Sequence, residues 1–174
     1  HNERWLGITN KETIMNKKVV KTSNTTLINK SYFCTTGLYL ENDHFKKSCD
    51  KIMNKTKYYR LGGDCYMYGM IASGLIDIVM EDTLKPHDYM ALINVVEGAG
   101  GKISDKYGKP ITLNSDGSLI ASSCEVLHNE IIELINNESS SLNMSPLRAV
   151  RALKVLRTAN NVKGMRQLMV GVFN

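Results

Sequence analysis

Gly62-Gly63-Asp64-Cys65-Tyr66 opens the stretch that decides the fold of this chain, and Gly98-Ala99-Gly100-Gly101 closes it. Between the two motifs, residues 65–73 are predicted to form a helix that ends at a glycine. The mostly apolar run over residues 75–81 is typical of a buried strand. Residues 89–97 predict a second helix. The order helix, strand, helix indicates an α/β domain.

Three carboxylates stand where these elements begin or end. Asp64 and Asp88 lie where the two helices are expected to start, and Glu81 ends the strand between them. A single aspartate in such a place commonly caps a helix, since its oxygen accepts hydrogen bonds from free backbone amides. Ligands of α/β folds also gather at these ends. Both alternatives, helix cap and ligand site, therefore stay open for the two aspartates.

Three motifs in this stretch resemble a known family. They are Gly-Gly-Asp-Cys-Tyr at 62–66, Leu-Lys-Pro-His-Asp-Tyr at 84–89 and Val-Glu-Gly-Ala-Gly-Gly at 96–101. Together they resemble the inositol monophosphatase family of Mg²⁺-dependent phosphomonoesterases, and most closely its histidinol-phosphatase branch. The resemblance implies a layered α/β sandwich, of which residues 1–137 would form the carboxyl-terminal half.

The resemblance also implies roles for particular residues. Asp88 would bind a catalytic Mg²⁺, and Glu81, seven residues earlier, would contact the part of the substrate that is not phosphate. Asp64, Gly63 and Thr36 are further candidates for substrate contacts. For Asp64 the helix-cap alternative stays open. No residue is assigned as the catalytic acid or base.

The substrate class follows from the same comparison. Many family members have Trp before the metal-binding Asp, whereas this chain has His87, as in the histidinol-phosphatase branch. We expect the His87 side chain to pack beneath the site. Histidinol carries an ammonium group and an imidazole, which acids such as Glu81 and Asp64 would attract. The prediction is hydrolysis of histidinol phosphate, or a related small phosphate ester, by metal-activated water, as a step in histidine biosynthesis.

The rest of the domain fits an α/β fold that is incomplete as a catalyst. Residues 4–20 predict a β-meander. The remaining elements are expected over residues 31–37 (strand and turn), 42–53 (helix), 57–61 (strand), 102–104 (strand), 118–122 (strand) and 125–135 (helix). The resembled family draws further metal ligands from a Glu and an Asp-Pro-x-Asp-Gly-Thr signature, and neither occurs in this sequence. The 174-residue chain alone is therefore expected to be inactive.

Charge and cysteine content limit the other functions. Residues 1–137 hold 16 Lys and Arg against 16 Asp and Glu, so the net charge of +5 belongs to residues 138–174. A neutral main domain argues against nucleic-acid binding. The four cysteines lie far apart, which predicts buried reduced thiols and a cytoplasmic protein; they are Cys34, Cys49, Cys65 and Cys124. A homodimer is a further expectation.

The last segment differs in character from the domain. Residues 136–141 are rich in Asn and Ser and predict a linker. Beyond it, cationic residues recur at every third position between apolar ones, at Arg148, Arg151, Lys154 and Arg157. This pattern over residues 145–174 resembles the voltage-sensing helix and following linker of cation channels. Residues 147–158 are too few to span a bilayer, which needs about 20 residues. The alternative function is thus a non-enzymatic module whose separate basic helix binds an anionic membrane or an acidic partner.

Overall fold

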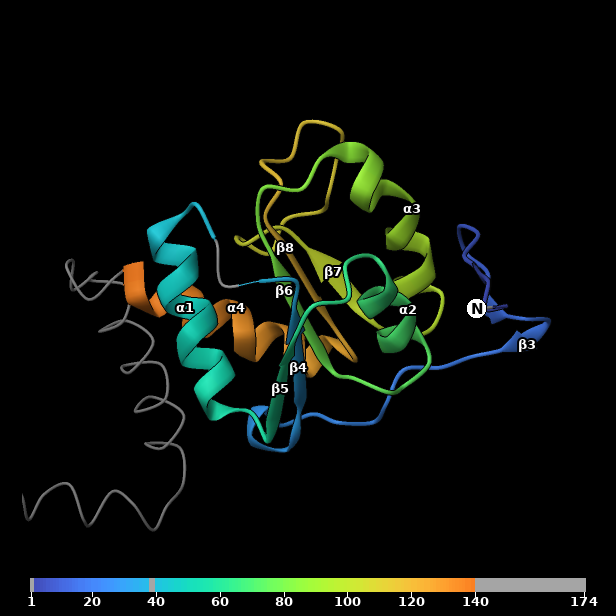
Figure 1. Cartoon of the computed structure of the whole chain (residues 1–174), viewed down its shortest axis with the longest axis horizontal. Helices are drawn as coiled ribbons and strands as arrows, with labels where there is room; N and C mark the ends of the chain where they lie inside the picture. The colour runs from blue at the N-terminus through green and yellow to red at the C-terminus, as the bar shows by residue number, and fades with distance from the viewer. Residues whose placement is uncertain (1, 38–39, 140–174) are drawn as a thin grey trace, which may run out of the picture. The chain divides into compact units, whose positions relative to one another are not determined.

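A five-stranded mixed sheet with helices on both faces forms the centre of the structure (Figure 1). The structure is a computed structural model, and it describes residues 2–37 and 40–139. The elements in chain order are β1 (Trp5–Leu6), β2 (Ile14–Met15), β3 (Lys18–Val19), η1 (Ile28–Lys30), β4 (Tyr32–Thr35), α1 (Asp43–Lys55), β5 (Tyr58–Leu61), α2 (Tyr66–Ala72), β6 (Ile78–Glu81), α3 (Pro86–Glu97), β7 (Lys102–Ser104), β8 (Leu119–Ser122) and α4 (Glu125–Ser139). The predicted α/β layering is confirmed.

The strand order of the central sheet places the site. The order is β5-β4-β6-β8-β7, with β5, β4 and β6 parallel and β8 antiparallel to its two neighbours. The carboxyl ends of the three parallel strands therefore lie at one edge of the sheet. Thr36 and Gly62 follow β4 and β5 at this edge, and Glu81 is the last residue of β6.

Alternation along the strands gives the sheet two buried faces. One face packs with α1 and α4 through a cluster of buried side chains: Ile28, Phe33, Phe45, Cys49, Ile52, Met53, Ile78, Met80, Ile120, Leu127, Ile131 and Ile135. The other face packs with α2 and α3 through a second cluster: Cys34, Met67, Tyr68, Ile71, Ile76, Val79, Tyr89, Val96, Ile103, Leu119 and Ala121. Figure 1 shows the two helix pairs on opposite sides of the sheet.

The predicted β-meander forms a small separate sheet, β1-β2-β3. Trp5 attaches it to the second helix pair, since its indole N–H donates to Ser73 Oγ at 2.9 Å. Gly69 of α2 makes room for this ring, because a Cβ there would lie 2.8 Å from the Trp5 side chain. The meander thus rests on α2, the helix that leads out of the Gly62-Gly63 turn.

Asp77, just before β6, ties the far edge of the sheet together. One of its carboxylate oxygens accepts from the Ser23 hydroxyl, and the other accepts from Tyr32 N at 2.7 Å. Its carbonyl accepts from Ser123 N at 2.9 Å. Three distant segments therefore meet at one buried acid, at the end of β6 opposite Glu81.

Three element boundaries differ from the predictions. β6 begins at Ile78 rather than 75, after the Asp77 junction, and α3 begins at Pro86 rather than 89. Proline suits the first helical turn because its fixed φ is helical and its missing N–H has no role there. α4 continues through Ser139, beyond the predicted end at 135 and into the expected linker. Asn and Ser are weak helix formers but not helix breakers.

No helix in the described ranges is long and apolar enough to cross a membrane. The predicted basic helix and the voltage-sensor resemblance fall on residues 145–174, which lie outside the described residues. The boundary at 137 remains a prediction.

Candidate active site

A cavity of about 420 Å³ lies at the carboxyl end of β6. Asp64, Glu81 and Asp88 all line it, so the structure brings together the three carboxylates singled out in the sequence. A hollow of about 800 Å³ lies against β1 and β2, but among the described residues its lining holds a single carboxylate, Glu3. Clustered acids are what phosphate-ester chemistry with a divalent cation requires. The smaller cavity is therefore the candidate active site.

Glu81 is a buried carboxylate held by two hydroxyl groups. It is 5% exposed, and Oε1 accepts from the Thr36 hydroxyl while Oε2 accepts from the Tyr68 hydroxyl at 2.7 Å. Burial raises the pKa of Glu81, and the nearby Asp64 and Asp88 add to this, whereas the two hydroxyl bonds oppose it. The strand end and the first residue after β4 thus fix a carboxyl group at the cavity wall.

Tyr68 is a site residue that sequence reasoning missed. It is fully buried in α2, lines the cavity and donates to Glu81. Burial, together with the Glu81 charge beside it, raises the pKa of Tyr68 well above its ordinary value. A buried tyrosine usually has a hydrogen-bond partner for its hydroxyl, so a tyrosine in a helix expected to be buried was the sequence signal that could have pointed to Tyr68. The sequence did not show that the partner is an acid 13 residues away.

Asp88 lines the cavity, and one of its two carboxylate oxygens is bonded to the start of its helix. It occupies the third position of α3, and Oδ2 accepts from Lys85 N at 2.8 Å. The N-cap of α3 is Lys85, so Asp88 closes the helix start from inside rather than as the N-cap residue. Oδ1 accepts no hydrogen bond within the described part of the chain, and His87 Nε2 lies 3.5 Å from it. One oxygen is thus left to meet a ligand.

The predictions for His87 and Cys65 were wrong. The His87 side chain is 81% exposed and lines the cavity rather than packing beneath it. With Pro86 as the first residue of α3, His87 takes the second position of the helix. The Cys65 thiol is exposed at the same cavity, whereas Cys34 and Cys49 are buried as expected.

Of the other three candidates, Asp64 lines the cavity, whereas Gly63 and Thr36 are not among its lining residues. Asp64 lines the cavity, with a φ of +42°, and α2 has Cys65 as its N-cap residue with no side-chain cap. The helix-cap alternative for Asp64 is therefore wrong. Gly63 has a φ of +131°, and a Cβ there would lie 2.7 Å from Met67, so it shapes the turn. Thr36 is connected to the site through its bond to Glu81.

These residues fit one part of a metal site. Among residues 2–37 and 40–139, no group of three or more His, Cys, Asp or Glu side chains is placed to hold a metal ion. Asp88 alone fits a single oxygen position of a hard cation such as Mg²⁺, which prefers an octahedron of oxygen ligands. The remaining ligands would have to come from elsewhere.

The chain matches a family model and curated proteins. Residues 1–140 match the model described as the inositol monophosphatase family. The chain is 36% identical over 125 residues to the bifunctional phosphatase IMPL2, chloroplastic, of Arabidopsis thaliana, which covers 72% of this chain and 36% of that protein. It is 31% identical over 75 residues to a histidinol-phosphatase of Chlorobaculum parvum, covering 43% of this chain and 28% of that protein.

Solved structures show the same architecture. An inositol monophosphatase from Zymomonas mobilis superposes with a TM-score of 0.74 at 34% identity, over 77% of this chain and 53% of that one. An inositol monophosphatase II from Staphylococcus aureus, at 18% identity, has a TM-score of 0.71 over 80% of this chain and 53% of its own. The second likeness shows the fold alone. The chain spans about a third of the two curated relatives and about half of these two structures.

Proposed function

The chain belongs to the inositol monophosphatase family, and from that premise we propose that it is the carboxyl-terminal half of a Mg²⁺-dependent phosphomonoesterase. The cavity with Asp64, Glu81 and Asp88 supports this proposal. The share of the relatives that the chain spans supports the idea that a second half supplies the missing ligands. Mg²⁺, when bound, would neutralise phosphoryl charge and activate a water molecule.

Asp88 contributes one metal-binding oxygen in this proposal. The bond from Lys85 N to Oδ2 restrains the carboxylate and leaves Oδ1 as the oxygen for the metal. The amino-terminal turn of α3 lies beside it, and helix amino termini favour anions such as phosphate. A fixed carboxylate next to a helix start suits a site that binds a metal and a phosphate together.

Glu81 carries the proposal on the substrate. Both of its oxygens accept from neutral hydroxyls, so it brings a negative charge, with no cation of the described chain bonded to it, to the cavity wall. Such a charge attracts a cationic leaving group more than a neutral polyol. We therefore favour histidinol phosphate or a related cationic phosphate ester, in agreement with the name of the Chlorobaculum relative. A role in histidine biosynthesis, cytoplasmic localisation and a homodimer remain predictions.

The metal role is tested in the complete protein with Asp88→Asn. This variant should keep the fold and lose most phosphatase activity, because an amide oxygen is a poor replacement for a charged Mg²⁺ ligand. Activity is measured against Mg²⁺ concentration on a purified protein that contains both halves.

The matched control is Asp43→Asn, which removes a carboxylate from the first turn of α1 instead of α3. It should leave activity unchanged. Normal turnover and an unchanged Mg²⁺ requirement in the Asp88→Asn protein would end the metal assignment.

A further inference from the structure

The segment of residues 105–118, between β7 and β8, contacts the chain just before Asp88. Leu84 N donates to Gly117 O at 3.1 Å. Gly117 has a φ of +88°, and a Cβ there would stand 2.4 Å from Leu84 O, so the two backbones are in direct contact. Leu84 also lines the candidate cavity. The turn that leads into α3 is therefore shaped by the 105–118 segment.

The same segment contacts the chain just after Asp88. Tyr89 is fully buried, and its hydroxyl donates to Thr112 O at 3.0 Å. Thr112 lies in a closed turn, since Ser115 N donates to Thr112 O at 3.2 Å and Ser115 Oγ accepts from Thr112 N at 2.9 Å. Asp88 is thus held between two contacts to one segment.

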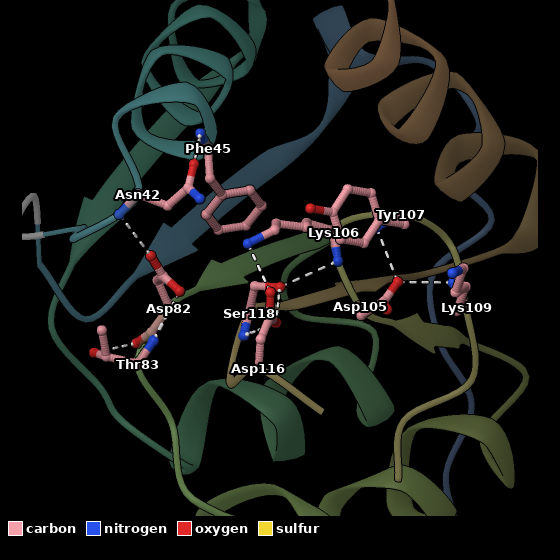
Figure 2. Close-up of polar contacts among 10 residues, drawn as sticks. All are labelled: Asn42, Phe45, Asp82, Thr83, Asp105, Lys106, Tyr107, Lys109, Asp116 and Ser118. Atoms are coloured by element: carbon pink, nitrogen blue, oxygen red, sulfur yellow. Dashed lines mark hydrogen bonds and ion pairs between the residues drawn. The ribbon is translucent and has the colours of Figure 1, made fainter. Parts of the chain in front are cut away.

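An ion pair anchors the 105–118 segment itself (Figure 2). Lys106 Nζ lies 2.6 Å from Asp116 Oδ2, and the Lys106 side chain is only 11% exposed. The other oxygen of Asp116 accepts from the Ser118 hydroxyl at 2.6 Å. Burial opposes the charge on Lys106, but Asp116, with smaller contributions from Tyr107 and Asp82, outweighs it and raises the pKa of Lys106. The pair therefore stays charged at neutral pH.

The first turn of the segment is also fixed. Asp105 Oδ1 accepts from Tyr107 N at 2.9 Å and from Lys109 N at 2.8 Å, as Figure 2 shows. Asp82, on the turn before Leu84, accepts from Thr83 N at 2.9 Å and from Asn42 N at 3.1 Å. Both sides of the contact between Leu84 and Gly117 are thus held by side-chain bonds to backbone amides.

We propose that the 105–118 segment sets the position of Asp88 at the cavity, with Tyr89, Lys106 and Asp116 as positioning residues. The proposal rests on the proposed role of Asp88 as a metal ligand. A ligand has to be held to within a fraction of an ångström of its productive position. Outer groups that orient a ligand commonly change metal affinity when they are removed.

Two substitutions test the proposal in the complete protein, with both halves present. Tyr89→Phe removes only the hydroxyl bonded to Thr112, and Lys106→Met keeps the aliphatic stem but removes the charge. Backbone amide resonances of residues 84–89 report the position of the turn, and their broadening by added Mn²⁺ reports metal binding at Asp88. Each variant should shift these resonances and weaken Mn²⁺ binding by about tenfold.

The control is Ser123→Ala. It removes a buried hydroxyl that donates to Thr25 O at 3.0 Å, at the end of β8 away from the 105–118 segment. It should lower the melting temperature but leave Mn²⁺ binding and the resonances of residues 84–89 unchanged. Variants of Tyr89 and Lys106 that behave like this control would overturn the proposal. If Lys106→Met does not fold, Tyr89→Phe and Lys106→Arg decide the question.

Failure of the metal role is distinguishable from failure of the positioning role. If the complete, unaltered protein with both halves shows no Mn²⁺ broadening at Asp88, the proposed metal ligand is wrong. The positioning role is then judged on the resonances of residues 84–89 alone. The positioning role is supported if Tyr89→Phe shifts these resonances and Ser123→Ala does not. It is contradicted if neither variant shifts them.

Discussion

At the scale of single residues, Glu81 combines deep burial with a negative charge. Burial raises its pKa, so the folded state holds a proton on Glu81 more tightly than the unfolded chain does. Its contribution to stability is therefore greatest at pH values below the ordinary pKa of a glutamate, and it is lost as the pH rises through the folded value. The ionised form of Glu81 is thus less favourable in the folded state than in the unfolded chain, a pattern common where a site serves binding rather than folding.

The variant Glu81→Gln tests what this charge does for the substrate. In the complete protein, kcat/KM should fall more for histidinol phosphate than for a neutral inositol phosphate. Loss of a bond to a charged group costs about 1.5–3 kcal/mol, against about 1 kcal/mol for a neutral hydrogen bond. Steady-state kinetics with both substrates give the ratio.

The melting temperature of the same variant shows whether a loss of activity could come from unfolding. Glu81→Gln removes the buried charge, so its melting temperature at pH 7 should match or exceed that of the unaltered protein. Equal losses of kcat/KM for the two substrates would show that Glu81 does not recognise charge.

Sequence motifs pointed to the carboxylates of the site but not to the groups that hold them. Asp88 and Glu81 lie in short local motifs, so their meeting at one cavity was predictable. Tyr68 looked like an ordinary core residue of a helix, because its role depends on a contact across the sheet edge. His87 was expected to pack beneath the site in place of the aromatic residue of the resembled family, but its side chain is exposed, and no local pattern in the sequence indicates that.

At the scale of elements, His128 joins α4 to two strands. Ser104 donates its own proton to Asp105 O at 2.8 Å, so it accepts from His128 Nε2 at 2.8 Å. His128 Nδ1 then accepts from the Ser122 hydroxyl at 2.7 Å. The imidazole is therefore neutral, with the proton on Nε2. Burial, with a smaller effect from Lys102, lowers the pKa of His128 to about 4.

This neutral histidine predicts acid sensitivity. Between pH 6.5 and about 4 the unfolded chain binds a proton at His128 and the folded chain does not, so stability falls as the pH falls. The full loss is on the order of 3 kcal/mol, at about 1.4 kcal/mol per pH unit. Urea unfolding at several pH values measures it.

His128→Gln is the comparison protein. It should be less stable at pH 7, because it replaces a bonded ring in the core. Its stability should change much less between pH 6.5 and 4. An equally steep loss in this variant would place the acid-sensitive group elsewhere.

The sequence predicted elements better than their ends. Either Asn42 or Asp43 was a candidate cap of α1, and the structure shows Asn42 in that role, since its Oδ1 accepts from Phe45 N at 2.9 Å. The β-meander and the alternation of strands and helices were also confirmed. The end of α4 was not, because Asn and Ser are weak helix formers that do not by themselves end a helix. Contacts such as that between Leu84 and Gly117 join residues that no local pattern connects.

At the scale of the whole molecule, the excess charge falls in a different part of the sequence from the residues of the candidate site. Residues 1–137 carry no net charge, and residues 138–174 carry all of the +5. The basic residues of the tail recur at every third position, so on a helix they would not stay on one wet face. Burying them against the domain would cost several kcal/mol each.

Deletion of residues 138–174 should therefore leave the melting temperature of the remaining chain nearly unchanged. It should also lower the affinity for vesicles of anionic lipid, which sedimentation measures at physiological salt. A large fall in melting temperature would mean that the tail belongs to the domain and that the boundary at 137 is wrong. Because α4 runs through Ser139, a second deletion that begins at residue 140 separates loss of the helix end from loss of the tail.

The two buried acids at the ends of β6 are expected to be constrained in evolution for different reasons, one by folding and the other by substrate binding. Asp77 uses both carboxylate oxygens and its carbonyl to join segments of the fold, so a replacement there lowers the stability of the fold. Glu81 is bonded to two rotatable hydroxyls at a cavity wall, so in the proposed function a replacement there mainly affects substrate binding. We therefore expect substitutions at the Glu81 end of β6 to change substrate preference and substitutions at the Asp77 end to change the stability of the fold.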